Sequence, residues 1–252
     1  MNIDDCLVSI ITPSFKSKDF IKDTINSVYH QVYSNFEMII VDDFSSDKSA
    51  DYIESILPDE RFKLIRLEKN IGAAEARNIA IGKAQGRYIA FLDSDDLWYP
   101  EKLEKQIKFM QNNELAFSYT SYDLINESGD KLNKVVKSVT SINFNGYMKN
   151  TIIGCLTVMI DRSKVKPFLM PNLRSSHDMA LWGDIMKNND IKAYGMSDVL
   201  SSYRLVSTSN TANKKKAAKE VWNVYREYFK FNFIKSSWFF INYAIHAILK
   251  RL

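Results

Sequence analysis

The sequence predicts an α/β fold in which a mostly parallel sheet carries helices on both faces. Short apolar runs alternate four times with amphipathic or alanine-rich segments over residues 1–112. The connections between them are short, and parallel strands need a crossover of helical length, so the alternation favours a doubly covered parallel sheet. A hydrophobic fraction of 46% and a charged fraction of 25% are ordinary for a soluble globular protein of 252 residues.

Four strand–helix repeats account for the first part of the chain. β-branched and aromatic residues dominate the predicted strands, which are residues 7–12, 37–41, 62–67 and 88–92. Pro13 ends the first of these strands, because proline cannot donate to a sheet ladder. Apolar residues at helical spacing, or a run of alanines, predict the helices, which are residues 19–31, 46–57, 72–84 and 100–112. Ser46 and Asp47 supply a cap for the second helix.

The second part of the chain is less regular, but no linker rich in Pro, Gly or Ser separates it from the first. The predicted elements here are strands at residues 117–124, 158–161 and 199–205 and a helix at residues 178–187. Residues 1–212 therefore form one predicted domain, with halves at 1–112 and 113–212. Residues 213–252 form a predicted helical tail.

The net charge of +4 is unevenly distributed along the chain. Residues 210–252 contain nine Lys or Arg and two Glu, a net charge of +7, so the preceding residues sum to −3. Aromatic residues alternate with these basic residues in helical patterns, which is typical of a helix at a membrane surface. A packing helix or a dimer contact would explain the same aromatics. No nucleic-acid-binding motif accompanies the basic residues.

Cys6 and Cys155 lie far apart and do not suggest a disulfide framework, which is consistent with a reducing compartment. The N-terminal sequence MNIDDCLVS has neither the basic nor the apolar region of a signal peptide. No apolar run is long enough to span a membrane. These features predict a cytoplasmic protein.

Polar residues follow three of the four predicted strands of the first half. Pro13, Ser14 and Phe15 follow the first strand, Asp42 and Asp43 the second, and the sequence DSDD at residues 93–96 the fourth. The carboxyl ends of parallel strands meet at one edge of a sheet, where ligands bind. Three adjacent carboxylates repel one another, and a divalent cation with oxygen ligands would offset that repulsion. A solvated acidic turn that caps the next helix is the alternative.

Several motifs together resemble those of family 2 glycosyltransferases. The motifs are VSIITPSFK, VDDFSSD, GAAEARN, GRYIAFLDSDD, HDMALW and SYRLV, in this order. Within the family the chain is similar to enzymes of bacterial surface polysaccharide synthesis, of the teichuronic acid and O-antigen type. The resemblance implies a GT-A fold, with a nucleotide-binding half at residues 1–112 and an acceptor half at residues 113–212.

The resemblance implies a nucleoside diphosphate sugar as donor. Phe15 would stack on the base, where the family usually has tyrosine. Asp43 would accept a hydrogen bond from a ring N–H, which uracil, thymine and guanine offer, and a UDP-sugar is favoured. Pro13 and Gly72 would line the donor site, and Arg77 would meet a phosphate. Alternatives are a core aromatic for Phe15, a loop-orienting role for Asp42 and a surface arginine for Arg77.

A divalent metal, Mn²⁺ or Mg²⁺, is also implied by the resemblance. Asp93 and Asp95 match the DXD pair, with Ser94 between them and Asp96 beside them. One carboxylate would meet the ribose hydroxyls and one the metal, and the sequence leaves open which one ligates directly. The metal would offset the charge on the leaving diphosphate.

Asp178 matches the carboxylate that the family uses as general base, so inversion at the anomeric carbon is expected. Two positions depart from the family pattern. His177 stands where an acidic residue is usual, and Gly183 and Asp184 occupy the region where an arginine is often found. His177 is interpreted as a phosphate ligand or simply as the start of a helix, and Asp178 could be a helix cap instead.

A polar loop after Tyr203 and Arg204 resembles the family's late flexible loop, which closes over the diphosphate. The chain has no histidine between His177 and His246, so Arg204, the loop hydroxyls or the lysines would assist the leaving group. The family's usual acceptor, a lipid-linked saccharide, favours peripheral contact of residues 213–252 with the inner face of the cell membrane. A homodimer is the alternative use of this tail.

Two rival functions remain. A nucleotidyltransferase acting on sugar phosphates could use a similar sheet and acidic cluster, but the sequence PSFKSKDF poorly matches the glycine-rich, basic loop expected there. An inactive nucleotide-sugar-binding scaffold is the second rival. The joint presence of Asp43, Asp93, Asp95 and Asp178 argues against it.

Overall fold

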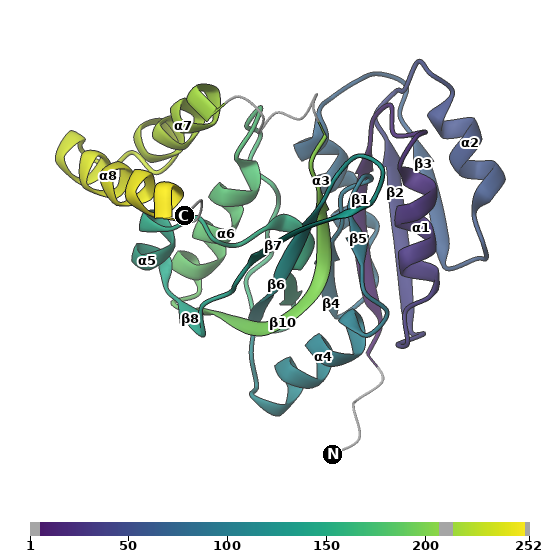
Figure 1. Cartoon of the computed structure of the whole chain (residues 1–252), viewed down its shortest axis with the longest axis horizontal. Coiled ribbons are helices and arrows are strands. Elements are labelled where there is room, and N and C mark those ends of the chain that lie inside the picture. The colour runs from purple at the N-terminus through teal and green to yellow at the C-terminus, as the bar shows by residue number, and fades with distance from the viewer. Residues whose placement is uncertain (1–5, 207–213, 250–252) are drawn as a thin grey trace.

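In the computed structural model, a ten-stranded sheet runs through the part of the chain that the structure describes, residues 6–206 and 214–249 (Figure 1). The strand order is β3-β2-β1-β4-β9-β6-β10-β5, with β7 paired to β6 and β8 paired to β10. The strands are β1 (Val8–Ser14), β2 (Phe36–Asp42), β3 (Phe62–Arg66), β4 (Tyr88–Phe91), β5 (Leu97–Trp98), β6 (Phe117–Ile125), β7 (Lys131–Val136), β8 (Ser141–Ile142), β9 (Met159–Asp161) and β10 (Ala193–Arg204).

Helices cover both faces of this sheet (Figure 1). They are α1 (Ile21–Tyr29), α2 (Ser49–Ile56), α3 (Ala73–Lys83), α4 (Lys102–Asn112), α5 (Phe144–Lys149), the 3₁₀ turn η1 (Cys155–Thr157), α6 (His177–Asn188), α7 (Lys214–Asn223), the π-helical turn η2 (Val224–Tyr228) and α8 (Phe233–Leu249). The predicted α/β fold with helices on both faces and a helical tail is confirmed.

The four repeats of the first half form the parallel part of the sheet, as predicted. β1 pairs in parallel with β2 on one side and β4 on the other, and β2 pairs in parallel with β3. Successive side chains of β1 enter opposite cores: Ile10 lies in the core under α1, α2 and α4, and Ile11 in the core under α3 and α6. Burial on both faces explains why these strands read as continuous apolar runs.

β1 continues through Pro13 to Ser14, two residues beyond the predicted end. The backbone carbonyl of Ser14 accepts a hydrogen bond from Asp43 in the loop after β2, while that of Ile11 accepts one from Leu92 after β4. Pro13 lies two residues after Ile11 and faces the same side, where β4 has already ended. Its missing N–H therefore breaks no ladder bond.

The second half makes the sheet mixed, because β6 pairs in parallel with β10 while the other pairs formed there are antiparallel. β9 runs antiparallel to both β4 and β6, and β5 runs antiparallel to β10. β10 is 12 residues long and begins at Ala193, six residues before the predicted start. The sequence did not predict β5, β7, β8 or α5, which are short or exposed and depend on partners distant in the chain.

The tail packs onto the rest of the molecule through a shared core. Val221, Tyr225 and Phe239 belong to the same buried cluster as the inner face of α6. The Tyr225 hydroxyl donates a hydrogen bond of 2.5 Å to the carbonyl of Met148 in α5. Among residues 6–206 and 214–249, no helix is both long and apolar enough to cross a membrane. Cys6 and Cys155 are both free thiols, as predicted.

Lys102 is a fully buried lysine in the first turn of α4. Its Nζ lies 3.9 Å from the centroid of the Trp98 ring and has no hydrogen-bond partner within the described ranges. Burial lowers the pKa of this amine well below its usual value. An unpaired charge in this position would be costly, so the neutral amine is the form that the fold favours.

Replacing Lys102 by methionine should stabilise the protein at neutral pH by about 1–2 kcal/mol, because an apolar chain of similar length removes the desolvation cost. The unfolded lysine has a pKa of about 10.4, so below that value the unfolded state binds the extra proton. Wild-type stability should therefore rise as the pH increases from 7 towards this value, and the variant should lose that rise. Urea unfolding at several pH values measures both effects.

The matched control is Lys108→Met on the exposed face of the same helix. It should leave stability and its pH dependence unchanged. A Lys102→Met protein no more stable than the Lys108→Met protein would show that the buried amine is already compensated.

Candidate active site

The candidate site lies at the carboxyl ends of β1, β2 and β4. In the β1–β2 register Ser14 is opposite Asp42, and in the β1–β4 register Ile11 is opposite Phe91. The polar residues after these strands, which the sequence singled out, therefore lie on neighbouring strand ends. The predicted meeting of these loops at one edge of the sheet is confirmed.

Asp43 secures the loop that leads into α3. Its two carboxylate oxygens accept hydrogen bonds from the backbone N–H groups of Ile71 and Gly72, at 2.7 and 2.8 Å. Gly72 is the N-cap of α3 with φ of +91°, a conformation that glycine adopts without strain. The predicted loop entering a helix is therefore present, but the Gly72 amide is already bound to Asp43. Asp42 orients its own loop, because its carboxylate accepts a hydrogen bond of 2.9 Å from the backbone N–H of Ser45.

Two aromatic rings are exposed beside Asp43. Phe15 is 49% exposed directly after β1, so it is not a core aromatic. Phe44 is 55% exposed and has φ of +61°, which is unusual for a bulky residue. Phe44 was not among the predicted site residues, although its place after two aspartates in VDDFSSD was the available signal.

A buried network connects the fourth strand end to α6. Arg77 of α3 is only 5% exposed and donates to the Asp93 carboxylate through Nη2. Through Nη1 it bonds to Nε2 of His177 at 2.7 Å. Arg77 is therefore a buried residue that links Asp93 to His177, and it is not a surface arginine. Asp178 follows His177 in the first turn of α6, so this network brings the acidic loop and the predicted base together.

The network also fixes the state of His177. Burial, followed by the positive charge of Arg77, lowers the pKa of His177, which favours a neutral ring. Since arginine can only donate, Nε2 must accept, and the proton lies on Nδ1, 3.3 Å from the carbonyl oxygen of Leu173. His177 therefore starts the helix, as one interpretation held, and orients Arg77 as well.

Asp178 is the second residue of α6, after Ser176 as N-cap. A carboxylate in the first turn is stabilised by the helix dipole. The helix itself is anchored by Trp182, which is fully buried and packs edge-on against Phe91 and Phe117 of the sheet. Asp178 therefore projects from a rigid element, and it is not the N-cap that the alternative interpretation required.

The remaining acidic loop residues have different surroundings. Burial, followed by the charge of Asp93, raises the pKa of Asp95 to about 6. Burial, followed by the charges of Asp95 and Asp93, raises the pKa of Asp96 well above its usual value. Asp96 is 1% exposed and accepts a hydrogen bond of 2.9 Å from the backbone N–H of Arg204. The carbonyl oxygens of Ser94 and Asp96 accept from Thr24 of α1, at 3.0 and 2.9 Å.

Arg204 lies beneath the acidic loop at the end of β10. It is 2% exposed, and its Nε donates to the carbonyl oxygen of Asp95 at 2.7 Å. Nη1 donates to the carbonyl of Glu127 at 2.7 Å, and Nη2 approaches Asp23 at 3.4 Å. These contacts hold the shape of the loop. Residues 207–213 of the predicted flexible loop lie outside the described residues, and the lysines at its end, residues 214–216, begin α7 instead.

The acidic loop fits a divalent cation only if the substrate supplies further ligands. Within the parts of the chain that the structure describes, no three His, Cys, Asp or Glu side chains form a metal-binding group. Burial, followed by the charge of Asp93, raises the pKa of Asp95, and a cation beside both carboxylates would favour their charged forms. Mg²⁺ is commonly held by one or two carboxylates together with substrate phosphates. Asp95, with Asp93 beside it, suits that mode better than the buried Asp96.

The tail is attached directly to the helix that carries Asp178. A Cβ atom on Gly183 would lie 2.7 Å from the Phe229 ring, so any larger residue here would force the ring to move. The next residue, Asp184, accepts a hydrogen bond from the Tyr228 hydroxyl. Gly183 and Asp184, which stand where the family often has an arginine, therefore hold the tail against α6.

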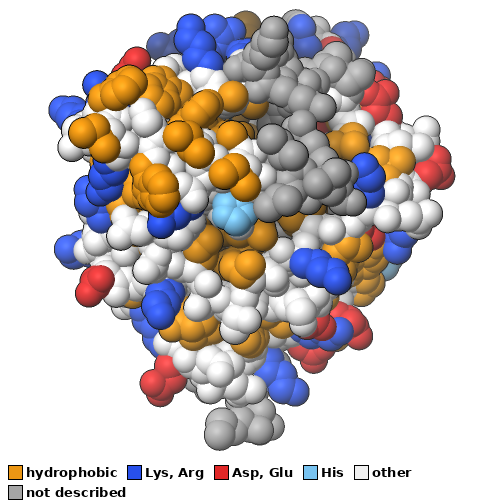
Figure 2. Space-filling view, turned by 60° about the vertical axis from the view of Figure 1, so that its left-hand side comes forward, with side chains coloured by type: hydrophobic (Ala, Val, Ile, Leu, Met, Phe, Trp, Pro, Cys, Tyr) orange, Lys and Arg blue, Asp and Glu red, His pale blue; other side chains and the backbone are white. Residues whose placement is uncertain are grey.

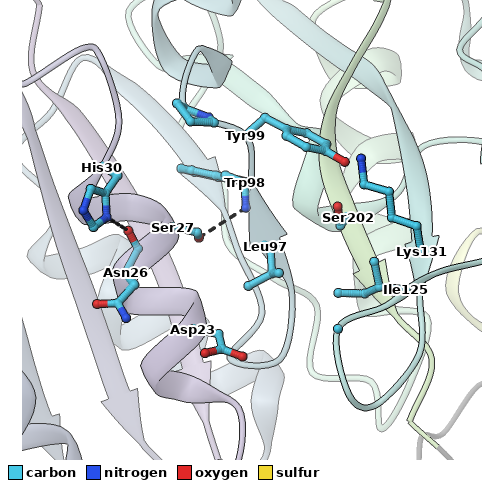
Figure 3. Close-up of a pocket in the computed structure, with 12 residues that line it drawn as sticks. Asp23, Asn26, Ser27, His30, Leu97, Trp98, Tyr99, Ile125, Lys131 and Ser202 are labelled. Atoms are coloured by element: carbon cyan, nitrogen blue, oxygen red, sulfur yellow. Dashed lines mark hydrogen bonds between the residues drawn. The ribbon is translucent and has the colours of Figure 1, made fainter.

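A pocket of about 390 Å³ lies apart from these residues, between α1 and the β5–β10 side of the sheet (Figure 3). Figure 3 shows Asn26 and His30 on one side and Tyr99 and Lys131 on the other. None of the predicted site residues lines it. Its link to the candidate site is Asp23, which lies on its wall and pairs with Arg204.

A sheet of this topology, an acidic pair after its fourth strand and a carboxylate on the facing helix define a GT-A glycosyltransferase. The chain belongs to glycosyl transferase family 2, whose model matches residues 9–166. The match includes the three strand ends and stops before Asp178.

Comparisons with curated proteins extend over the whole chain. It is 49% identical to TuaG of Bacillus subtilis (strain 168), a glycosyltransferase provisionally assigned to teichuronic acid biosynthesis, over 98% of both chains. It is 39% identical to the Escherichia coli enzyme WfgD, a UDP-Glc:α-D-GlcNAc-diphosphoundecaprenol β-1,3-glucosyltransferase, over 98% of this chain and 96% of that enzyme. The aligned regions therefore include α6 and most of the tail.

Two solved structures share the fold. Staphylococcus aureus TarS (residues 1–349) in complex with UDP-GlcNAc has a TM-score of 0.70 and 20% identity, covering 87% of this chain and 64% of that chain. The mannosyltransferase PcManGT of Pyrobaculum calidifontis, in complex with GDP-Man and Mn²⁺, has a TM-score of 0.70 and 18% identity, covering 90% and 65%. This chain thus spans about two thirds of their length.

Proposed function

We propose that this protein is a metal-dependent, inverting glycosyltransferase that moves a sugar from a UDP-sugar to a lipid-linked or polysaccharide acceptor in cell-surface glycan synthesis. The observation that carries the proposal is the Asp93–Arg77–His177 network, which connects the donor-side acidic loop to the helix of Asp178. The names of TuaG and WfgD support the cellular role and the type of donor.

The donor base lies, in this proposal, on the exposed ring of Phe15, with Pro13 two residues before it at the end of β1. Asp43 holds two backbone amides, and its carboxylate oxygens retain lone pairs for the ring N–H of uracil. Gly72 brings the α3 loop close to the nucleotide. Arg77 supplies positive charge near the diphosphate, while Arg204 acts as a positioning residue that shapes the acidic loop from below.

Asp95 and Asp93 would hold Mg²⁺ or Mn²⁺ together with the diphosphate oxygens. A bound cation would supply charge neutralisation for the departing diphosphate. The mannosyltransferase PcManGT was solved with Mn²⁺, which supports this assignment. Ser94 lies between the two carboxylates, and its carbonyl oxygen is fixed by Thr24. Asp96 keeps the loop attached to β10.

Asp178 acts as general base in the proposed reaction. An acceptor hydroxyl gives its proton to the Asp178 carboxylate as its oxygen forms a bond to the anomeric carbon. The bond between that carbon and the diphosphate oxygen breaks, and the electron pair leaves with the nucleoside diphosphate. Attack from the opposite face inverts the anomeric centre. WfgD forms a β linkage from UDP-glucose, whose sugar is α-linked, which supports inversion.

The tail provides the proposed membrane contact. On α8 the residues Ile234, Trp238, Ile241 and Ile245 recur at helical spacing, and all four are at least 50% exposed. Lys149 lies 5.7 Å from the Trp238 ring. Figure 2 shows hydrophobic side chains gathered on the face that carries the tail, with Lys and Arg around them. An apolar stripe with basic neighbours fits an anionic membrane surface at the inner face of the cell membrane.

The test is a panel of UDP-, dTDP- and GDP-sugars incubated with the protein and Mn²⁺ or Mg²⁺. The acceptors are lipid diphosphates that carry single sugars, including α-D-GlcNAc-diphosphoundecaprenol. Release of UDP that depends on the acceptor and stops with a chelator is expected, and the product linkage should be inverted. Because a cation held by Asp95 and Asp93 would offset charge on the leaving diphosphate, chelation should slow transfer roughly 100-fold or more.

Other outcomes would point to the rival functions. Release of pyrophosphate would identify a nucleotidyltransferase. Tight binding of a sugar nucleotide without any turnover would identify a scaffold. Transfer at full rate with excess chelator would remove the metal from the proposal.

A further inference from the structure

The molecule contains a second pocket, of about 210 Å³, that borders Asp178. Its walls come from α5, from the segment before α6 and from α7 and α8, which lie side by side in Figure 1. Ala217, Glu220 and Val221 of α7 line one wall, and Ser175 and Ser176 line the wall that carries Asp178. The tail is therefore part of the pocket that adjoins the proposed base.

The pocket contains a hydroxyl that lacks a partner. Ser175 Oγ is buried and has no hydrogen-bond partner within residues 6–206 and 214–249. Ser176 has φ of +57°, a left-handed conformation that is uncommon for serine and that accumulates at binding sites. An unpaired buried hydroxyl is costly unless a ligand or water completes it.

The chemistry of the walls favours an uncharged sugar. Two carboxylates, Asp178 and Glu220, face one lysine, Lys216, so a diphosphate would find no net positive charge there. Hydroxyls and carboxylates bind sugar hydroxyl groups, while the half-buried ring of Tyr243 offers apolar surface to the face of a pyranose. Drug-sized ligands occupy pockets of roughly 300–1,000 Å³, so this smaller pocket suits a single ring.

Tyr147 also shows that the pocket and the base are electrostatically connected. It is 1% exposed, and burial, followed by the negative charge of Asp178, raises the pKa of its hydroxyl well above the usual value. A sugar held in this pocket beside Ser175 would therefore lie next to the carboxylate that accepts its proton.

We propose that this pocket, formed jointly by the tail and the start of α6, binds the terminal, uncharged sugar of the acceptor. The proposal rests on the glycosyltransferase function proposed above. It assigns acceptor recognition to Ser175 and Glu220 and gives α7 a part in substrate choice. The lipid and its diphosphate then lie outside the pocket, towards the exposed face of α8.

The experiment fills the pocket from the tail side. Ala217→Phe places a ring in the pocket, and Ala218→Phe, one position along the same helix and outside the pocket lining, is the matched control. With the acceptor that the wild type uses best, Ala217→Phe should raise the acceptor KM roughly tenfold to hundredfold. The donor KM should change by much less, and Ala218→Phe should behave as the wild type.

Several results would overturn the inference. One is an acceptor KM for Ala217→Phe equal to that of the Ala218→Phe protein. Another is a rise in donor KM as large as that in acceptor KM, which would place the pocket on the donor side. If Ala217→Phe does not fold, Ser175→Ala and Glu220→Gln carry the test, and wild-type acceptor KM values in both would refute the assignment. Failure of the proposed function looks different, because the wild type would then release no nucleoside diphosphate from any donor.

Discussion

Replacing Asp178 by asparagine should reduce kcat for sugar transfer by roughly 10²- to 10⁴-fold, the usual contribution of a general base. The amide cannot take the acceptor proton, but it keeps the shape of the carboxylate at the start of α6. The donor site depends on other strand ends, so binding of the UDP-sugar should persist. Steady-state kinetics and calorimetric titration with the donor measure the two quantities.

Asp190→Asn is a suitable control for this variant. Asp190 is exposed just after α6 and has φ of +52°, which asparagine tolerates well. It should transfer sugar at the wild-type rate. Undiminished turnover of Asp178→Asn would mean that another group accepts the proton, whereas lost donor binding would place Asp178 in the donor site.

Replacing Arg77 by methionine should destabilise the fold by about 1–3 kcal/mol, because Asp93, which is 31% exposed, and the partly buried His177 both lose a hydrogen-bonding partner. Asp93 would lose its partner, and His177 would lose the donor to Nε2. Transfer should fall steeply as well, since Asp93 and the start of α6 would no longer be held together. Urea unfolding and the transfer rate measure the two effects.

Arg66→Met is the matched control, since Arg66 forms two ion pairs at the surface, with Asp51 and Glu54. Exposed pairs contribute little, so its unfolding midpoint should stay close to that of the wild type. An Arg77→Met protein as stable as this control would show that the Asp93–Arg77–His177 network is dispensable.

The parallel half of the fold was predictable because each strand there is a local apolar run between two helices. β5 was not, since Leu97 and Trp98 form a strand only through pairing with Ser201 and Ser202 of β10. Such pairing depends on residues about a hundred positions away and leaves no local pattern. The length of β10 was missed because its first residues are partly exposed and carry no continuous apolar run.

For the site, the sequence could place residues at strand ends but not the direction of their side chains. Arg204 was expected at the diphosphate, yet the structure directs it to the carbonyl oxygen of Asp95. Arg77 also bonds to His177, which lies 100 positions later in the chain, and the sequence did not predict this contact. Spacing alone cannot reveal such a contact, because it arises only when α3 and α6 pack on the same face of the sheet.

The packing of the Phe229 ring against Gly183 has a practical consequence for truncated variants of the protein. A chain cut after residue 212 would lose the Phe229 ring beside Gly183 and expose the inner surfaces of α5 and α6 to water. Apolar surface of this kind promotes aggregation. Soluble, active protein should therefore require the C-terminal helices. Chimeric proteins built from two relatives should take these helices and α6 from the same parent.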